Sequence, residues 1–245
     1  MSNKYVVIDL ETTGNSPKKG DKIIQFAAVV IENGQIIDQF SSLLCPNQSI
    51  PIFIEELTGI TDQMVQDAPL FAEIAPRVME LLKGAYFVAH NVLFDLSFLQ
   101  EELIMAGFEG FYGPILDTVE LSRILFPSSD SFKLNDLAIQ EGLQHDRPHQ
   151  ADSDAYVTGE LLLILFYRLR NLPLLTLRQL NKLSGGLKGD LDELLEGLIL
   201  IKESTVEQVP QQLEQYGGLF LKKLPIECET MESQTIEYPT NDKDK

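Results

Sequence analysis

The chain has 245 residues, a hydrophobic content of 44% and a formal net charge of −18 at pH 7. This length can bury a sizeable core, and the composition is that of a globular protein. Three classes are excluded: basic proteins that coat duplex nucleic acid, because the charge is negative without a basic patch; membrane-spanning proteins, because no apolar run approaches ~20 residues; and disulfide scaffolds, because Cys45 and Cys228 are the only cysteines. We therefore expect a cytoplasmic protein without a signal peptide.

Three strands are predicted first along the chain. Runs rich in Val, Ile and Phe cover residues 5–10, 23–32 and 35–44. Asn33-Gly34 between the last two runs is typical of a two-residue hairpin turn, so these strands should be antiparallel neighbours.

Helices and strands then alternate. Apolar residues at helical spacing, and short apolar runs between them, predict these elements. The predicted helices cover residues 71–84, 93–107, 119–126, 134–142 and 153–170, and the predicted strands cover residues 85–90 and 114–118. Asp117 or Thr118 is placed to cap the helix that follows it. Antiparallel strands followed by this alternation predict a mixed α/β sheet covered by helices.

The pattern changes beyond residue 171. Amphipathic helices are predicted over residues 172–183 and 190–203, and the polar, acidic sequence from residue 204 is typical of a linker or tail. The predicted domain division is 1–170 for the main domain, 171–203 for a helical extension and 204–245 for the linker. We expect this linker to lead into a further region of a longer protein.

Acidic side chains recur at the ends of these predicted elements. Asp9 and Glu11 end the first strand, and residues two apart on a strand project to the same face. Asp95 lies in the first turn of a helix, and His149 precedes Asp154 at the start of the last long helix. Taken singly, each of these residues has a structural explanation. Asp9 and Glu11 could be the solvated edge of a strand, Asp95 could be favoured by the helix dipole, and His149 could be a surface histidine.

Read together, these residues predict a metal site. Clustered carboxylates favour Mg²⁺ or Mn²⁺ over zinc, and four of them with one histidine fit two-metal phosphoryl transfer. A neutral imidazole beside such a site can take the proton of the attacking water. One choice stays open at this point: Asp152 and Asp154 are two apart at a helix start, so they point to nearly opposite faces and only one can face the metals.

Three stretches of the chain resemble the motifs of a known family. They are DLETTG at residues 9–14, HNVLFDLSFL at residues 90–99 and HQADSDA at residues 149–155. In order and spacing they resemble the DEDDh group of 3′–5′ exonucleases, the DnaQ-like family, over residues 4–170. The resemblance implies a ribonuclease H-like fold and two divalent ions, Mg²⁺ or Mn²⁺.

The resemblance also implies roles for the acidic residues and the histidine. Asp9 bridges both ions, Glu11 and Asp154 help to hold the ion on the side of the attacking water, and Asp95 acts on the side of the leaving group. His149 is the general base. The family spacing between histidine and aspartate selects Asp154 as the ligand, which leaves Asp152 as the helix cap.

Substrate contacts are implied by the same resemblance. In relatives, the loop after the first motif holds the terminal nucleotide, and a second loop packs against the terminal base. The corresponding residues here are Thr12, Thr13 and Gly14 in the first loop, and Leu57, Gly59 and Ile60 in the second. Thr58 departs from the family pattern, because many relatives have histidine there.

The second motif offers three more candidate substrate contacts: His90, Asn91 and Phe94. Phe94 could stack on a base or pack in the core. Asn91 could hold the geometry of the loop or touch the sugar-phosphate.

The predicted function is a metal-dependent 3′–5′ exonuclease that releases nucleoside monophosphates from single-stranded ends, with DNA favoured over RNA. The arrangement of an exonuclease domain, the helices beyond residue 171 and then a linker resembles the N-terminal region of DinG-type helicases of Gram-positive bacteria. This resemblance implies a covalently attached helicase region. This chain itself contains no GxxxxGK[ST] phosphate loop. Two alternatives are an RNA-trimming exonuclease, like ribonuclease T or oligoribonuclease, and a catalytically silent module that docks a polymerase or helicase.

Overall fold

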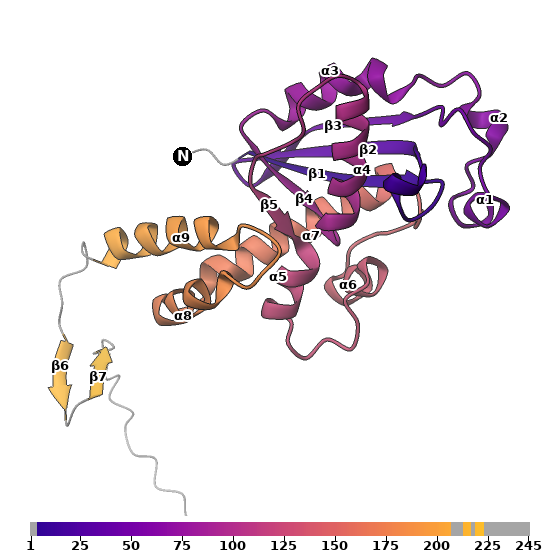
Figure 1. Cartoon of the computed structure of the whole chain (residues 1–245). Helices are drawn as coiled ribbons and strands as arrows, with labels where there is room; N and C mark the ends of the chain where they lie inside the picture. The colour runs from indigo at the N-terminus through magenta and orange to yellow at the C-terminus, as the bar shows by residue number, and fades with distance from the viewer. Residues whose placement is uncertain (1–3, 207–212, 217–218, 223–245) are drawn as a thin grey trace, which may run out of the picture. The chain divides into compact units, whose positions relative to one another are not determined.

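The protein is built on a five-stranded mixed sheet. A computed structural model describes residues 4–206, 213–216 and 219–222 (Figure 1). The sheet has the order β3-β2-β1-β4-β5, with β1–β2 and β2–β3 antiparallel and β1–β4 and β4–β5 parallel. The strands are β1 (Lys4–Thr12), β2 (Ile23–Glu32), β3 (Gln35–Leu43), β4 (Ala85–Ala89) and β5 (Ile115–Asp117). The predicted mixed sheet is confirmed.

The predicted hairpin between β2 and β3 is also confirmed. Asn33 and Gly34 both have positive φ, 53° and 77°, as a two-residue turn between twisted strands requires. In β2 every residue except Glu32 is buried. Because helices cover both faces of the sheet, this strand is apolar at almost every position, with Gln25 as the buried exception, instead of alternating.

Helices cover the two faces of the sheet (Figure 1). They are α1 (Ile52–Thr58), α2 (Asp62–Val65), α3 (Phe71–Leu82), α4 (Val92–Met105), α5 (Thr118–Leu125), α6 (Leu134–Glu141), α7 (Ala151–Asn171), α8 (Leu174–Ser184) and α9 (Leu191–Val206), with a short 3₁₀ helix η1 (Pro17–Lys19). Apolar side chains of α3 and α4 pack with Val6, Ile8 and Leu10 of β1. Those of α5, α6 and α7 pack with Tyr5 and Val7, on the other face. Successive side chains of β1 thus point to opposite faces of the sheet and pack into two separate hydrophobic clusters.

One segment differs from its prediction. The second predicted substrate loop, with Leu57, Gly59 and Ile60, is partly helical: α1 runs to Thr58 and α2 begins at Asp62. Only Gly59, Ile60 and Thr61 connect them, and Gly59 ends α1 in the left-handed region with φ 73°. Both helices are too short for the sequence to show helical periodicity.

The C-terminal extension shares the core of the sheet. Residues 1–203 form one compact unit. Leu177 of α8 and Leu191 and Leu195 of α9 are buried in the same cluster as α7. The loop before α9 also pairs with β5, because the Asp190 amide donates to the Ile115 carbonyl at 2.7 Å and its carboxylate accepts from the Ile115 amide at 2.8 Å. The extension is therefore held by both packing and hydrogen bonds.

We expect Leu195→Ala to destabilise the whole unit. Leu195 is 0% exposed, so truncation leaves a cavity and should lower the free energy of unfolding by about 2–5 kcal/mol. Urea unfolding should still show one transition. Leu200→Ala on the same helix is the control, because Leu200 is 66% exposed and its truncation should change little. Equal small effects of both variants would mean that α9 does not share the core.

The second unit comprises residues 204–245, and within it the structure describes a hairpin of β6 (Leu213–Tyr216) and β7 (Leu219–Lys222). The predicted linker otherwise lies outside the described residues and stays a prediction. No helix in the described part of the chain has the length and apolarity needed to cross a membrane.

Candidate active site

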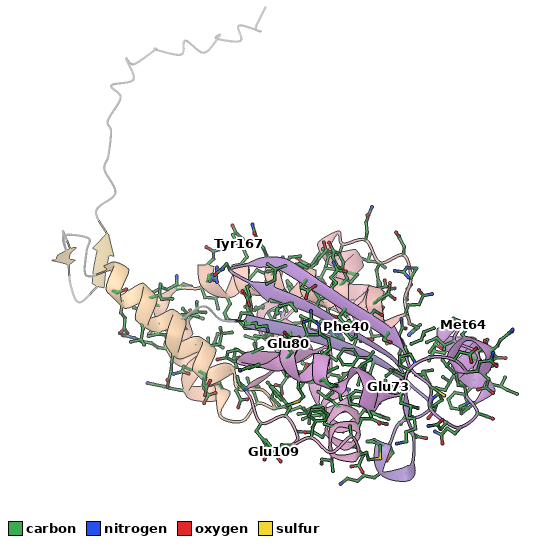
Figure 2. All side chains as sticks on the ribbon, turned by 90° about the horizontal axis from the view of Figure 1, so that it is seen from above. Phe40, Met64, Glu73, Glu80, Glu109 and Tyr167 are labelled. Carbon is green, nitrogen blue, oxygen red and sulfur yellow. The ribbon has the colours of Figure 1, made fainter. Side chains whose placement is uncertain are left out.

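The carboxyl end of β1 carries the first two acidic residues. Asp9 and Glu11 continue the row of Tyr5 and Val7, so both project to the face that α7 covers. Both are only partly buried, at the end of an otherwise buried strand. This end of the sheet lies toward α1 (Figure 1), and the labelled Met64 of α2 marks it when the strands are seen from above (Figure 2).

Asp154 joins them from the first turn of α7. One oxygen from each of Asp9, Glu11 and Asp154 can be chosen so that all three lie within 4.8 Å of one another. Three such oxygens at the rim of a sheet are hard ligands at a spacing that one divalent cation can bridge. The residues therefore fit a magnesium or manganese site.

Asp95, the fourth predicted ligand, also lies close to Asp9. It sits in the first turn of α4, is 4% exposed, and is outside the three-oxygen set. Repulsion by Asp95 contributes to the raised pKa of Asp9, so the two carboxylates are close enough to interact. Asp95 is likewise affected by the charge of Glu11, so all four carboxylates belong to one electrostatic cluster.

The electrostatics of this cluster call for a cation. Burial, with repulsion from Asp95, Asp154 and Glu11, raises the pKa of Asp9 well above its ordinary value. Burial and Asp154 raise the pKa of Glu11 to about 7. The pKa of Asp95 is also raised, chiefly by burial, although backbone amides partly oppose this. Bound divalent charge would remove this repulsion, which supports the fit of a metal.

His149, the predicted general base, lies beside the cluster but does not join it. Its backbone N–H donates to Asp154 Oδ2 at 3.2 Å, at a positive φ of 62°. Its imidazole is exposed and has no hydrogen-bonding partner among the described residues. The prediction that His149 is the base stays a prediction.

The histidine that touches the cluster was missed. His145 Nε2 lies 2.6 Å from Asp154 Oδ1, and the side chain of His145 is 4% exposed. The only signal in the sequence was a second histidine four positions before His149. The path of the loop between α6 and α7 decides which ring meets the aspartate, and no periodicity describes such a loop.

The predicted role of Asp152 as the cap of α7 is wrong. The N-cap residue is Gln150, without a side-chain cap. The Asp152 carboxylate instead accepts from Arg147 at 2.7 Å and from Gln25 Nε2 at 3.4 Å. It lies too far into the first turn to cap, and it points away from Asp154, as residues two apart on a helix must. Of these two aspartates, only Asp154 is grouped with Asp9 and Glu11.

The predicted cap of α5, by contrast, is confirmed for Asp117. Its buried carboxylate accepts from the Val119 amide at 2.8 Å, and also from the amides of Asn91 and Val92 at 3.3 and 3.2 Å. One side chain therefore anchors the starts of α4 and α5. Because α4 carries Asp95, this capping also sets the position of a predicted ligand.

The loop after β1 is tightly held. Thr12 Oγ1 donates to the Gly14 carbonyl at 2.7 Å, and Thr13 Oγ1 accepts from the Lys22 amide at 2.9 Å and from Gln48 Nε2 at 3.0 Å. A Cβ at Gly14 would collide with the carboxylate of Asp21. These contacts give Thr12, Thr13 and Gly14 a defined shape beside the carboxylates, and their predicted contact with the terminal nucleotide stays a prediction.

The second predicted substrate loop divides into exposed and buried residues. Leu57 is 51% exposed on α1 and is available to a ligand. Ile60 is 3% exposed and packs with Ile24, Ile50 and Val65, so its side chain belongs to the fold. Gly59 supplies the left-handed turn between them. Of this loop, Leu57 has the side chain that can contact a base.

The residues of the second motif are mostly engaged within the protein. His90 Nε2 donates to the Phe132 carbonyl, and its Nδ1 accepts from the Thr118 hydroxyl, both at 2.8 Å. Burial lowers the pKa of His90, in keeping with this neutral ring. Asn91 is exposed at a positive φ of 82°, where it shapes the loop. Phe94 is half-buried against Phe98, which favours the packing interpretation.

Comparison with known proteins agrees with this arrangement. The family model RNase_T, described as Exonuclease, matches residues 6–162. Over 84% of its length the chain is 55% identical to the 3′-5′ exonuclease DinG of Bacillus subtilis (strain 168), and over 89% it is 36% identical to the protein of that name in Staphylococcus aureus (strain USA300). It spans only 22% and 24% of these two relatives.

Solved structures share the fold. Exonuclease X in complex with 5′ overhanging duplex DNA matches with a TM-score of 0.55 and 25% identity, over 66% of this chain and 91% of that one. E. coli exonuclease I in complex with a dT13 oligonucleotide matches with a TM-score of 0.61 and 22% identity, over 68% and 41%. The nuclease domain of 3′hExo, a DEDDh family member, bound to rAMP, matches at 0.59 and 21%, over 68% and 92%.

Proposed function

The chain belongs to the exonuclease family. From this premise we propose that it is a 3′–5′ exonuclease of the DEDDh type, which shortens single-stranded DNA from the 3′ end and releases nucleoside monophosphates. The observation that carries the proposal is the set of Asp9, Glu11 and Asp154 oxygens within 4.8 Å of one another at the open end of the sheet. Such a set has a clear use in phosphodiester hydrolysis and no evident use in holding the fold together.

The proposed mechanism assigns one task to each residue. Two divalent ions, Mg²⁺ or Mn²⁺, would supply the charge that stabilises the transition state and activates water. Asp9 interacts with all three of the other carboxylates, which supports the proposal that it would hold both ions. His149 accepts the proton of the attacking water. Its ring is exposed and makes no hydrogen bond to the described residues, which supports an encounter with water and substrate rather than a structural role.

In this proposal, substrate binding depends on the metal ions and on contacts to the last nucleotide of the strand. The net charge of −18 repels a polyanion, so affinity from a broad basic surface is not expected. The rigid loop of Thr12, Thr13 and Gly14 and the exposed Leu57 border this end of the sheet and support contacts to the terminal nucleotide. A short single strand satisfies these features better than a duplex.

We further propose that this nuclease is one part of a longer protein with a helicase region. The support is that its DinG relatives are more than four times longer than the matched segment. The cytoplasmic setting expected from the sequence belongs to the same proposal.

The test uses single strands of DNA and RNA of the same sequence, labelled at either the 3′ or the 5′ end. With Mn²⁺ or Mg²⁺ we expect early loss of the 3′ label as a mononucleotide, progressive shortening of the 5′-labelled strand, and no reaction in EDTA. Faster hydrolysis of RNA would identify an RNA-trimming enzyme instead. No metal-dependent release from either strand would leave a silent docking module.

A further inference from the structure

A second histidine is built into the metal cluster. His145 lies in the loop between α6 and α7, and its Nε2 is 2.6 Å from Asp154 Oδ1. The side chains of His145 and Asp154 are only 4% and 14% exposed. His145 therefore makes a buried polar contact with a predicted ligand, although it lies outside the three family motifs.

Both oxygens of Asp154 are held from the same loop. Oδ1 accepts from His145 Nε2, and Oδ2 accepts from the backbone N–H of His149 at 3.2 Å. A carboxylate can accept about four hydrogen bonds, so each oxygen keeps a lone pair for a cation. These two contacts fix the carboxylate plane and still leave Asp154 able to serve as a ligand.

The ring of His145 acts as a donor. A carboxylate only accepts, so Nε2 carries the proton and cannot take one from water. Its Nδ1 is buried and has no partner in the described part of the chain. A ring used only for packing would better be apolar, because a buried polar atom without a partner costs stability. The Asp154 contact is the interaction that explains a histidine at this position.

We propose that His145 is a positioning residue that holds the Asp154 carboxylate in the orientation in which it binds the divalent cation. The inference rests on the proposed metal-dependent nuclease function, because Asp154 needs a fixed orientation only if it is a ligand. Residues that hydrogen-bond a metal ligand typically change metal affinity or activity by about 10–100-fold when they are removed.

Two variants test this assignment. Their affinity for Mn²⁺ is measured in the absence of nucleic acid, with the electron paramagnetic resonance signal of the free ion as the readout. His145→Ala should weaken Mn²⁺ binding by about 10–100-fold and raise the Mn²⁺ concentration for half-maximal nuclease rate by a similar factor. Saturating Mn²⁺ should restore most of the rate. His145→Gln, whose amide can donate from a similar position, should recover most of the affinity. Unchanged affinity in His145→Ala, or equal losses in both variants, would overturn the proposal.

Two further variants separate this proposal from the function on which it rests. Asp154→Ala should abolish binding of at least one Mn²⁺. His149→Ala should leave Mn²⁺ affinity unchanged, because within the described residues its ring has no hydrogen-bonding partner. If Asp154→Ala binds Mn²⁺ normally, the metal site itself is wrong. If Asp154→Ala loses the ion but His145→Ala does not weaken it, only the role of His145 is wrong. Thermal unfolding in EDTA shows whether each variant is folded.

Discussion

Asp9→Asn is expected to lower the nuclease rate by about a thousandfold or more while making the metal-free protein more stable. Loss of a shared metal ligand removes several kcal/mol of transition-state stabilisation, and each 1.36 kcal/mol is tenfold in rate. Asparagine keeps the size of the side chain but removes a charge that burial and three neighbouring carboxylates disfavour. Rates with labelled single strands and thermal unfolding in EDTA at pH 8 measure the two effects.

The same repulsion predicts how the stability of the metal-free protein depends on pH. The pKa of Glu11 rises from 4.5 to about 7 on folding, so over this range the folded state binds more protons than the unfolded state. Glu11 therefore costs almost no stability below about pH 4.5, and the cost grows to about 3 kcal/mol as the pH rises through 7. Glu11→Gln should lack this loss between pH 4.5 and 7, and Mn²⁺ should oppose it in the native chain.

Asp152 provides a matched control for Asp154, because both residues lie in the first turn of α7. Asp152 pairs with Arg147 and faces away from Asp154. A partly exposed ion pair is worth about 1 kcal/mol or less, so Asp152→Ala should change stability slightly and leave the nuclease rate near that of the native protein. Asp154→Ala should lose the rate. Equal losses in these two variants would contradict the assignment of Asp154 as the ligand.

The second large effect is expected at His149. His149→Ala should lower the rate at saturating Mn²⁺ by about 10²–10⁴-fold, the usual contribution of a general base. Its exposed ring has no partner among the described residues, so folding and metal affinity should stay unchanged. Added imidazole should restore part of the activity, because the base is missing while the metal site is intact.

His145→Gln is the comparison for this variant. Glutamine can donate to Asp154 but cannot act as a base at neutral pH, so a positioning role for His145 leaves the rate at saturating Mn²⁺ largely intact. If His145→Gln fell as far as His149→Ala and both were rescued by imidazole, His145 would be the base. The rate at saturating Mn²⁺ and the rescue by imidazole in these two variants therefore distinguish the general base from the positioning residue.

Regular elements were predictable because their signals are local. The Asn33-Gly34 turn has one favoured geometry, and it brought β2 and β3 together as expected. The alternation along β1 placed Asp9 and Glu11 on one face without any tertiary information. The helices α3 to α7 appear near their predicted bounds because each buries an apolar stripe.

In the C-terminal extension, the sequence predicted the helices but not their packing partners. Amphipathic helices were expected over residues 172–183 and 190–203, and α8 and α9 lie there. An apolar stripe shows that a helix must pack, but it does not show against what. Contact of Leu195 with the α7 cluster and pairing of Asp190 with β5 depend on long-range packing, and they join the extension to the nuclease core.

The sequence by itself determined the mixed sheet, the hairpin and the pairing of Asp9 with Glu11 on one face, because strand and turn geometry are properties of short stretches. Only the tertiary structure decided that an Asp154 oxygen comes within 4.8 Å of oxygens of Asp9 and Glu11, and that Asp152 pairs with Arg147. It also decided that the ring of His145, and not that of His149, donates a hydrogen bond to Asp154. These outcomes depend on how α7 crosses the sheet and on the path of an irregular loop. A loop without periodicity takes its shape from the surfaces that it joins, so the position of its histidines is a property of the assembled fold.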